Sequence, residues 1–140
     1  MNNAIKKLWF TNDRIWIKTT DGTVKNLMLE VFPELYYATN YEREDFYLYD
    51  NDRSIRWDNI DLDINISNFF EDITINSDNE VNKLLSQFPF LDLKAFASYV
   101  NMHWTKLARY KFGVWEPSEA EFEDINKGLQ QIAKEMLEVV

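Results

Sequence analysis

The apolar residues of this chain change their spacing across a short polar run, TINSDNE (residues 74–80), and this change most constrains its fold. Before the run, RIWIKTT (14–20) alternates isoleucines with other side chains, the period of two that is typical of a half-buried strand. After the run, VNKLLSQF (81–88) places apolar residues at i, i+3, i+4 and i+7, which predicts an amphipathic helix. We therefore expect an α+β chain, with a small domain of short antiparallel strands and short helices over 1–73 and an all-α domain over 80–140.

Turn signals divide the first part into strands. Asn12-Asp13 separates predicted strands over 6–11 and 14–20, and Asp21-Gly22 predicts a two-residue type I′ hairpin because glycine adopts a positive φ without strain. The other elements expected in this part are a strand over 23–30, a short helix over 31–38 with Pro33 at its start, strands over 46–49 and 54–57 around Asp50-Asn51-Asp52, and a short helix capped by Ser67.

Capping signals divide the second part into helices. Asp92 is expected to cap a helix that ends near Asn101, a residue that tolerates the left-handed conformation. A third helix should run from about His103 and end at Gly113, and a capping box, S-x-x-E at 118–121, should open the last helix. The side chains expected to be buried by this last helix are Phe122, Ile125, Leu129, Ile132 and Met136.

Charge is unevenly distributed along the chain. The net charge is −9, which excludes a basic coat over the whole molecule as a nucleic-acid surface. Residues 1–80 hold 8 basic and 16 acidic side chains, whereas 81–140 hold 7 and 8. Within 93–115 there are four basic residues and no acid, so a local basic patch is expected there.

Several classes of function are disfavoured. The chain has no cysteine and a single histidine, so we expect no metal site and no histidine-based proton relay. It has no nucleophile-elbow motif and no glycine-rich phosphate loop, so we expect neither an enzyme nor a bound cofactor. Asp58, Asp61 and Asp63 lack the spacing of a calcium loop and are interpreted as solvated. No segment has the composition of a signal peptide or a membrane span, and we expect a cytoplasmic protein.

Residues 93–129, LKAFASYVNMHWTKLARYKFGVWEPSEAEFEDINKGL, carry a recognisable pattern. Ala97 lies inside the first predicted helix, Asn101 stands where a turn glycine is usual, and Met102 and Leu107 supply the apolar positions that follow. Further matching positions are Gly113, Pro117-Ser118, Ile125 and Leu129. The segment resembles the Cro/Xre-type helix-turn-helix of prokaryotic repressors, and this resemblance implies a lambda-repressor-like fold.

The resemblance also implies which residues would contact DNA. In such proteins the second motif helix enters the major groove, so Trp104, Thr105 and Arg109 would face the bases. Arg109 is the strongest candidate because a guanidinium can donate two hydrogen bonds to guanine. Lys94, Lys106 and Lys111 would contact phosphates.

The first part carries a second resemblance. Its features are the Asp21-Gly22 hairpin, the run Phe-Pro-Glu-Leu at 32–35, and Trp57 before the Asp-Leu-Asp strand at 61–63. These features resemble an uncharacterised bacterial domain-of-unknown-function family of small β/α proteins. Members of that family can carry a C-terminal helix-turn-helix, and some lie beside small toxin-like genes. The resemblance implies fold and context but no chemistry.

Two functions are compatible with these features. The first is a sequence-specific DNA-binding transcriptional regulator, of which an antitoxin-like autorepressor is one form, acting on duplex DNA as a homodimer. A toxin-like protein would then be a candidate partner for the acidic first domain. The alternative is a non-catalytic protein-interaction module whose helix-turn-helix no longer binds DNA. In that case Trp104, Phe112 and Trp115 would lie in a protein interface, where tryptophan and arginine often dominate binding.

Overall fold

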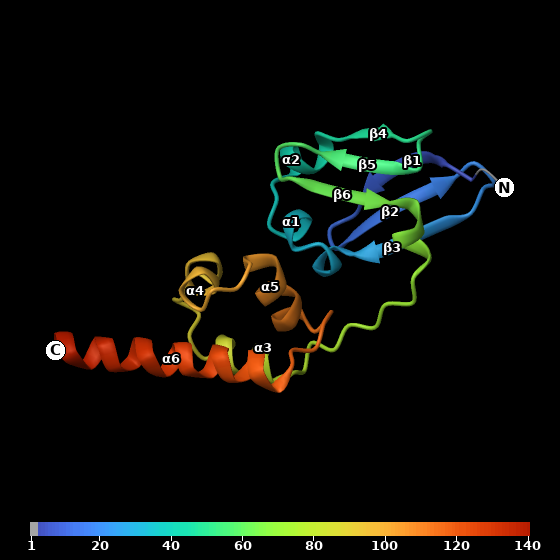
Figure 1. Ribbon diagram of the computed structural model, residues 1–140. Coiled ribbons are helices and arrows are strands. Elements are labelled where there is room, and N and C mark those ends of the chain that lie inside the picture. Colours follow the sequence, from blue (N-terminus) through green and yellow to red (C-terminus); the bar gives the residue numbers. More distant parts are fainter. Residues whose placement is uncertain (1–2) are drawn as a thin grey trace. The chain divides into compact units, whose positions relative to one another are not determined.

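The computed structural model describes residues 3–140, and the chain divides into two compact units, Met1–Ile73 and Thr74–Val140. The described residues form six strands, six α-helices and two short 3₁₀ helices (Figure 1). Every strand lies in the first unit, and the four longest helices lie in the second. The predicted α+β fold class is therefore confirmed.

The first sheet is a three-stranded antiparallel meander, in the order β1-β2-β3. Its strands are β1 (Ile5–Phe10), β2 (Arg14–Thr19) and β3 (Val24–Met28). Along β2, Ile15 and Ile17 are fully buried whereas Trp16 is only partly buried, as the period of two predicts. One face of this sheet therefore belongs to the core and the other faces away from it.

The hairpin between β2 and β3 differs from the predicted type I′ turn. Gly22 has φ 89°, but Asp21 has no positive φ, and a type I′ turn needs both. The Thr19 amide instead donates to the Thr23 carbonyl over 2.9 Å, which closes a three-residue loop. The Thr19 hydroxyl also donates to the Asp21 carboxylate over 2.5 Å, so a side-chain bond supports the wider loop.

The second sheet is also antiparallel, in the order β4-β5-β6. Its strands are β4 (Tyr47–Tyr49), β5 (Ser54–Trp57) and β6 (Leu62–Asn65). The turn between β4 and β5 holds Asp50, Asn51 and Asp52 in the left-handed region, with φ of 55°, 56° and 61°. Such a backbone is tolerated by Asn and Asp better than by other residues with a Cβ, and it brings the two strands together.

Short helices connect and flank the sheets. Pro33 is the first residue of α1 (Pro33–Tyr36), as predicted, and α1 follows η1 (Leu29–Val31). We did not predict α2 (Asn40–Glu44), which is held by a capping box between Thr39 and Glu42. The cap of η2 (Ile66–Phe70) is Asn65 rather than the predicted Ser67.

The core of the first unit draws on both sheets and on the short helices. Trp57 is fully buried, and its indole N–H donates to the Arg43 carbonyl over 2.9 Å, which ties β5 to α2. The remaining large buried apolar side chains are Ile5, Ile15, Ile17, Leu27, Leu29, Val31, Phe32, Leu35, Ile55, Leu62, Ile64 and Phe69. A backbone bond from Ile5 to Asp52 over 2.8 Å links the two sheets.

The second unit is all-helical. Its helices are α3 (Glu80–Ser86), α4 (Leu93–Tyr99), α5 (Trp104–Phe112) and α6 (Glu119–Val139). The caps at Asp92 and at Ser118 with Glu121 are confirmed, and Gly113, with φ 82°, ends α5 as predicted. The buried cluster of this unit is formed by Val81, Leu85, Phe96, Ala97, Leu107, Tyr110 and Ile125.

The far end of α6 departs from the prediction. Ile125 is fully buried, but Met136 is 52% exposed and Leu137 is 78% exposed. The prediction that Met136 is buried was therefore wrong, because the three shorter helices cover only the first part of this 21-residue helix. No helix within residues 3–140 combines the length and the apolar character that crossing a membrane requires.

Candidate nucleic-acid interface

The turn between α4 and α5 is built from backbone bonds and one left-handed residue. The Val100 amide donates to the Phe96 carbonyl over 3.1 Å and closes the last turn of α4. Asn101 then has φ 56°, as predicted, and the Met102 amide donates to the Ala97 carbonyl over 2.9 Å. The chain thus turns within a few residues, and α5 begins directly after His103.

Small residues let the helices of this unit approach closely. Ala97 on α4 is fully buried in the cluster that also holds Leu107 of α5. Gly128 on α6 faces α4, and a Cβ placed on it would lie 2.3 Å from Cγ1 of Val100. Any side chain at position 128 would therefore require the Val100 side chain or one of the two helices to shift.

The end of α5 is held by the segment that precedes α3. A Cβ on Gly113 would lie 1.7 Å from the Asn76 carbonyl oxygen, so only glycine fits there. The Asn76 amide donates to the Gly113 carbonyl over 3.0 Å. The Asn79 side chain, which caps α3, donates to the Asn76 and Lys111 carbonyls over 2.8 and 3.1 Å. These bonds join the start of α3 to the end of α5.

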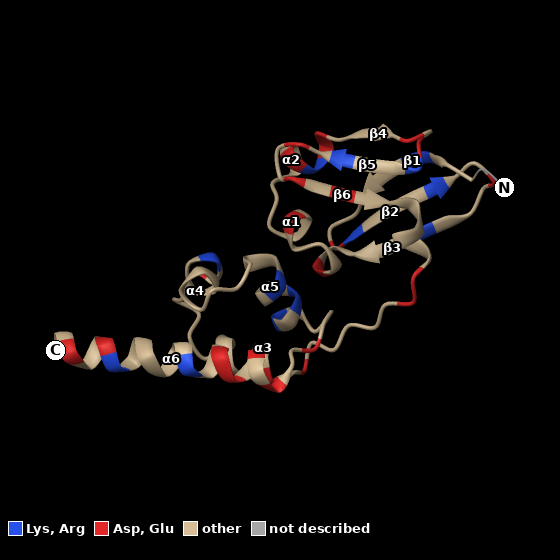
Figure 2. Cartoon of the chain, viewed as in Figure 1, with Lys and Arg blue, Asp and Glu red and all other residues tan. Residues whose placement is uncertain are grey.

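The structure brings two of the predicted DNA-contacting residues together across α4 and α5. The Lys94 ammonium lies 4.5 Å from the centroid of the Trp104 ring, a cation–π contact. Figure 2 shows basic segments on both helices, in contrast to the acidic start of α6. The first turn of α5 therefore presents an indole with a cation above it.

Arg109 lies on the same helix and is also paired with an indole. Its guanidinium carbon is 4.6 Å from the centroid of the Trp115 ring, in the loop after α5. Trp115 itself is 48% exposed. The sequence placed Trp115 only among the aromatic residues of the alternative, a protein interface. It gave no signal for a contact with Arg109, which lies six residues earlier, before the end of α5.

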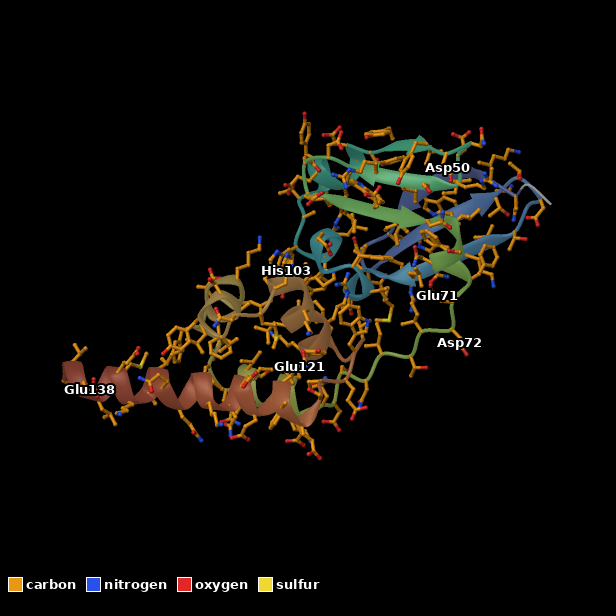
Figure 3. The ribbon with its side chains drawn as sticks, viewed as in Figure 1. Asp50, Glu71, Asp72, His103, Glu121 and Glu138 are labelled. Atoms are coloured by element: carbon orange, nitrogen blue, oxygen red, sulfur yellow. The ribbon has the colours of Figure 1, made fainter. Side chains whose placement is uncertain are left out.

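Lys106 is tied to an acid on α6. Its Nζ lies 2.5 Å from Oε2 of Glu121, and the Tyr110 hydroxyl donates to the same oxygen over 2.8 Å. These two bonds, that of Lys106 first, lower the pKa of Glu121 to about 2, and the Glu121 bond raises the pKa of Lys106. Glu121, labelled in Figure 3, was predicted only as a capping residue, so its role as a counter-ion was missed.

The two other predicted residues of α5 lie at its start and near its end. Thr105 follows Trp104, and its hydroxyl is 2.7 Å from Nδ1 of His103, the residue that caps the helix. Thr105 is 7% exposed, so among the three predicted base-facing residues it is the least accessible. Lys111 lies in the last turn and is partly buried.

An open cavity lies beside the end of α5. It measures about 730 Å³, and its walls combine aromatic residues with carboxylates. The aromatic and acidic lining residues are Tyr110, Trp115, Phe122, Glu80, Glu116, Glu119 and Glu123. Across residues 3–140, no group of three or more acidic or histidine side chains is placed to hold a metal ion.

The aspartates of the first unit have a partner that sequence reasoning missed. The Arg56 guanidinium donates to Asp58, Asp61 and Asp63 over 2.9, 2.7 and 2.8 Å. Each carboxylate remains more than half exposed, as the interpretation of these residues as solvated predicted. Their hydrogen bonds, led by that of Asp61, raise the pKa of Arg56 further above its already high value.

Comparison with known proteins identifies the first unit. A family model described as a protein of unknown function, DUF2442, matches residues 5–74. No curated protein and no solved structure matches the chain. The match confirms the resemblance of the first part to an uncharacterised domain family, and it ends before the predicted helix-turn-helix. Because the matched segment spans half of the chain, the protein belongs to the DUF2442 family.

Proposed function

We propose that the second unit binds duplex DNA sequence-specifically, with α5 as the recognition helix, and that the protein is a transcriptional regulator. The observation that carries this proposal is the turn between α4 and α5. A left-handed Asn101 and a fully buried Ala97 let two short helices meet at a tight turn. This turn supports the proposal because a helix-turn-helix joins its two helices in the same way.

The charges of this region support the same proposal. Residues 93–115 contain four cations and no acid, within a chain of net charge −9. A phosphate backbone is attracted to such a segment and repelled by the rest of the protein, so binding should depend strongly on salt. Lys94 and Lys111 are the better candidates for phosphate contacts, because Lys106 must first leave Glu121.

Arg109 is the proposed base-reading residue. Its contact with the Trp115 ring restricts the guanidinium before any ligand binds, so less conformational entropy is lost on binding. A bidentate contact with guanine would contribute roughly 1–3 kcal/mol of discrimination against other bases. The proposal therefore makes Arg109 the residue whose loss most affects specificity.

A homodimer is part of this proposal. Two recognition helices set about one helical turn of DNA apart would read a two-fold-symmetric site. The far end of α6 offers a surface for a second copy, with Met136, Leu137 and Val139 each more than half exposed. An antitoxin-like autorepressor, with a toxin-like partner on the acidic first unit, is one form that such a regulator would take.

The alternative function, a protein-interaction module, is favoured by one specific observation. Trp115 is half exposed and forms one wall of the 730 Å³ cavity, next to Arg109. Tryptophan and arginine are enriched among the residues that dominate protein–protein binding. A partner that inserted a side chain into this cavity would use the same surface without reading DNA.

The two functions are separated by selection from a random duplex DNA pool, at low and at physiological salt. We expect wild-type protein to enrich a two-fold-symmetric site, and Arg109→Ala to lose that enrichment. Lys127→Ala, which removes a cation from the exposed face of α6, is the matched control and should enrich the same site. Absence of enrichment by wild type at both salt concentrations would overturn the proposal and favour the interaction module.

A further inference from the structure

The outward face of the sheet β1-β2-β3 is basic and aromatic, although the chain is acidic. Because Ile15, Ile17 and Leu27 point into the core, their neighbours along the strands point outward. The strand register arranges the outward residues in three cross-strand rows, namely Lys7 with Lys18 and Val24, Trp9 with Trp16 and Asn26, and Arg14 with Met28. These eight positions hold three cations, two tryptophans and no carboxylate.

The two tryptophans form a stacked pair in the middle row. Their ring centroids are 6.0 Å apart and their planes differ by 9°. The indole N–H of Trp16 donates to the Thr11 hydroxyl over 2.9 Å, which fixes the orientation of its ring. Both side chains are partly exposed, so a planar ligand can reach a rigid aromatic surface.

Two cations lie directly beside this pair. Lys7 and Lys18 are exposed and are cross-strand partners, an arrangement in which like charges destabilise the sheet. Neither lysine makes an ion pair with an acid among residues 3–140. The Lys7 ammonium lies 5.2 Å from the Trp9 ring centroid, so a positive charge is held next to the aromatic surface.

We propose that this face binds single-stranded nucleic acid, with bases stacked on the Trp9–Trp16 pair and phosphates placed near Lys7 and Lys18. Single-strand binding proteins combine the same two elements, aromatic side chains on which bases stack and cations that follow the backbone. A duplex would not suit this face, because its bases are already stacked on one another. Figure 2 shows the basic segments of β1 and β2, which belong to a different unit from α5.

Nucleic acid fits this face better than other anionic partners do. An acidic peptide would satisfy the lysines but would leave the tryptophan pair unused. An anionic bilayer would draw the indoles into its interface, yet these rings are partly buried and one indole N–H is already bonded within the protein. A single strand supplies both phosphates for the lysines and planar bases for the tryptophan pair.

The test measures fluorescence anisotropy of labelled single-stranded DNA and RNA oligonucleotides with the full chain, at low and physiological salt. We expect Lys7→Glu/Lys18→Glu to weaken binding at least tenfold. The matched control, Lys127→Glu/Lys134→Glu, makes the same change in net charge on α6 and should keep most of the affinity. Trp9→Leu, with folding checked by circular dichroism, should weaken binding about tenfold, the loss expected for one stacked base.

Two further measurements separate this proposal from the proposed role of α5. Arg109→Ala should keep single-strand binding, and Lys7→Glu/Lys18→Glu should keep any duplex site. The proposal is overturned if wild type does not bind the oligonucleotides at low salt, or if the α6 control loses as much affinity as the sheet variant. It is also overturned if phosphatidylserine vesicles or polyglutamate bind this face and the oligonucleotides do not.

Discussion

Lys106 and Glu121 form an ion pair that joins α5 to α6, with Nζ and Oε2 2.5 Å apart. Tyr110 donates a hydrogen bond to the same carboxylate oxygen, and the Ser118 amide and hydroxyl donate to the other one. One carboxylate thus caps α6 and anchors the helix proposed to enter the groove. Its protonation state therefore affects both helices.

Removing the charge of Glu121 should lower stability in a pH-dependent way. Its pKa falls from 4.5 to about 2 in the folded protein, so its charge stabilises the fold above pH 4.5, and this contribution is lost as the pH falls towards 2. Glu121→Gln keeps a side chain that can cap the helix. We expect wild type to exceed this variant in urea midpoint at pH 7 and to match it near pH 2. The control, Glu123→Gln, should have nearly the same urea midpoint as wild type at every pH. If the urea midpoint of Glu121→Gln were lower than that of wild type by the same amount at pH 7 and pH 2, the prediction would be contradicted.

The backbone at position 101 should be sensitive to the presence of a Cβ. Asn101 has φ 56°, which residues other than glycine, Asn and Asp adopt at a cost of roughly 1–2 kcal/mol. Asn101→Ala should therefore lower the free energy of unfolding by about 1 kcal/mol, as measured by denaturant titration. Asn101→Gly should preserve or raise it. If alanine were as stable as glycine here, the left-handed turn between α4 and α5 would be refuted.

Gly128 should not tolerate alanine, although alanine favours a helix by about 1 kcal/mol. The added Cβ would lie 2.3 Å from Val100 Cγ1, and overpacking of this kind costs about 1–3 kcal/mol. We expect Gly128→Ala to lower the melting temperature. The double variant Gly128→Ala/Val100→Ala should recover part of that loss, because the contact is removed. Additive effects of the two substitutions would show that α6 and α4 do not meet at this point.

The exposed end of α6 should carry part of the proposed dimer contact. Leu137 is 78% exposed and Val139 is 88% exposed. Glutamate at either position would bring a charge into an apolar interface, and sedimentation equilibrium should show about a tenfold weaker dimer. Gln130→Glu, on the exposed surface of the same helix, is the control. If both variants had the dimer dissociation constant of wild type, the dimer contact would not involve this end of α6.

Local signals in the sequence predicted the helix ends of the second unit. Asp92, Asn101 and Gly113 each act through their own backbone or that of near neighbours, so their roles can be inferred without the fold. The same logic would have found α2, because Thr39 and Glu42 form a capping box. It was missed because a five-residue helix shows no apolar period.

Contacts between side chains that are far apart in the sequence could not be predicted from such local signals. The pairing of Lys106 with Glu121 depends on how α6 crosses α5, and the capping box predicted only one of the partners of Glu121. The stacking of Trp9 on Trp16 required the exact strand register, which the expected hairpin positions alone do not specify. The position of Met136 depended on how far the shorter helices reach along α6.

The turn between β4 and β5 has a consequence for evolution. Asp50, Asn51 and Asp52 are exposed, and all three hold left-handed backbone. Selection for folding alone would restrict these positions to asparagine, aspartate and glycine. If these three polar residues were invariant in other members of the family, the backbone geometry of the turn would be sufficient to explain it. Their invariance would be no sign of a binding site.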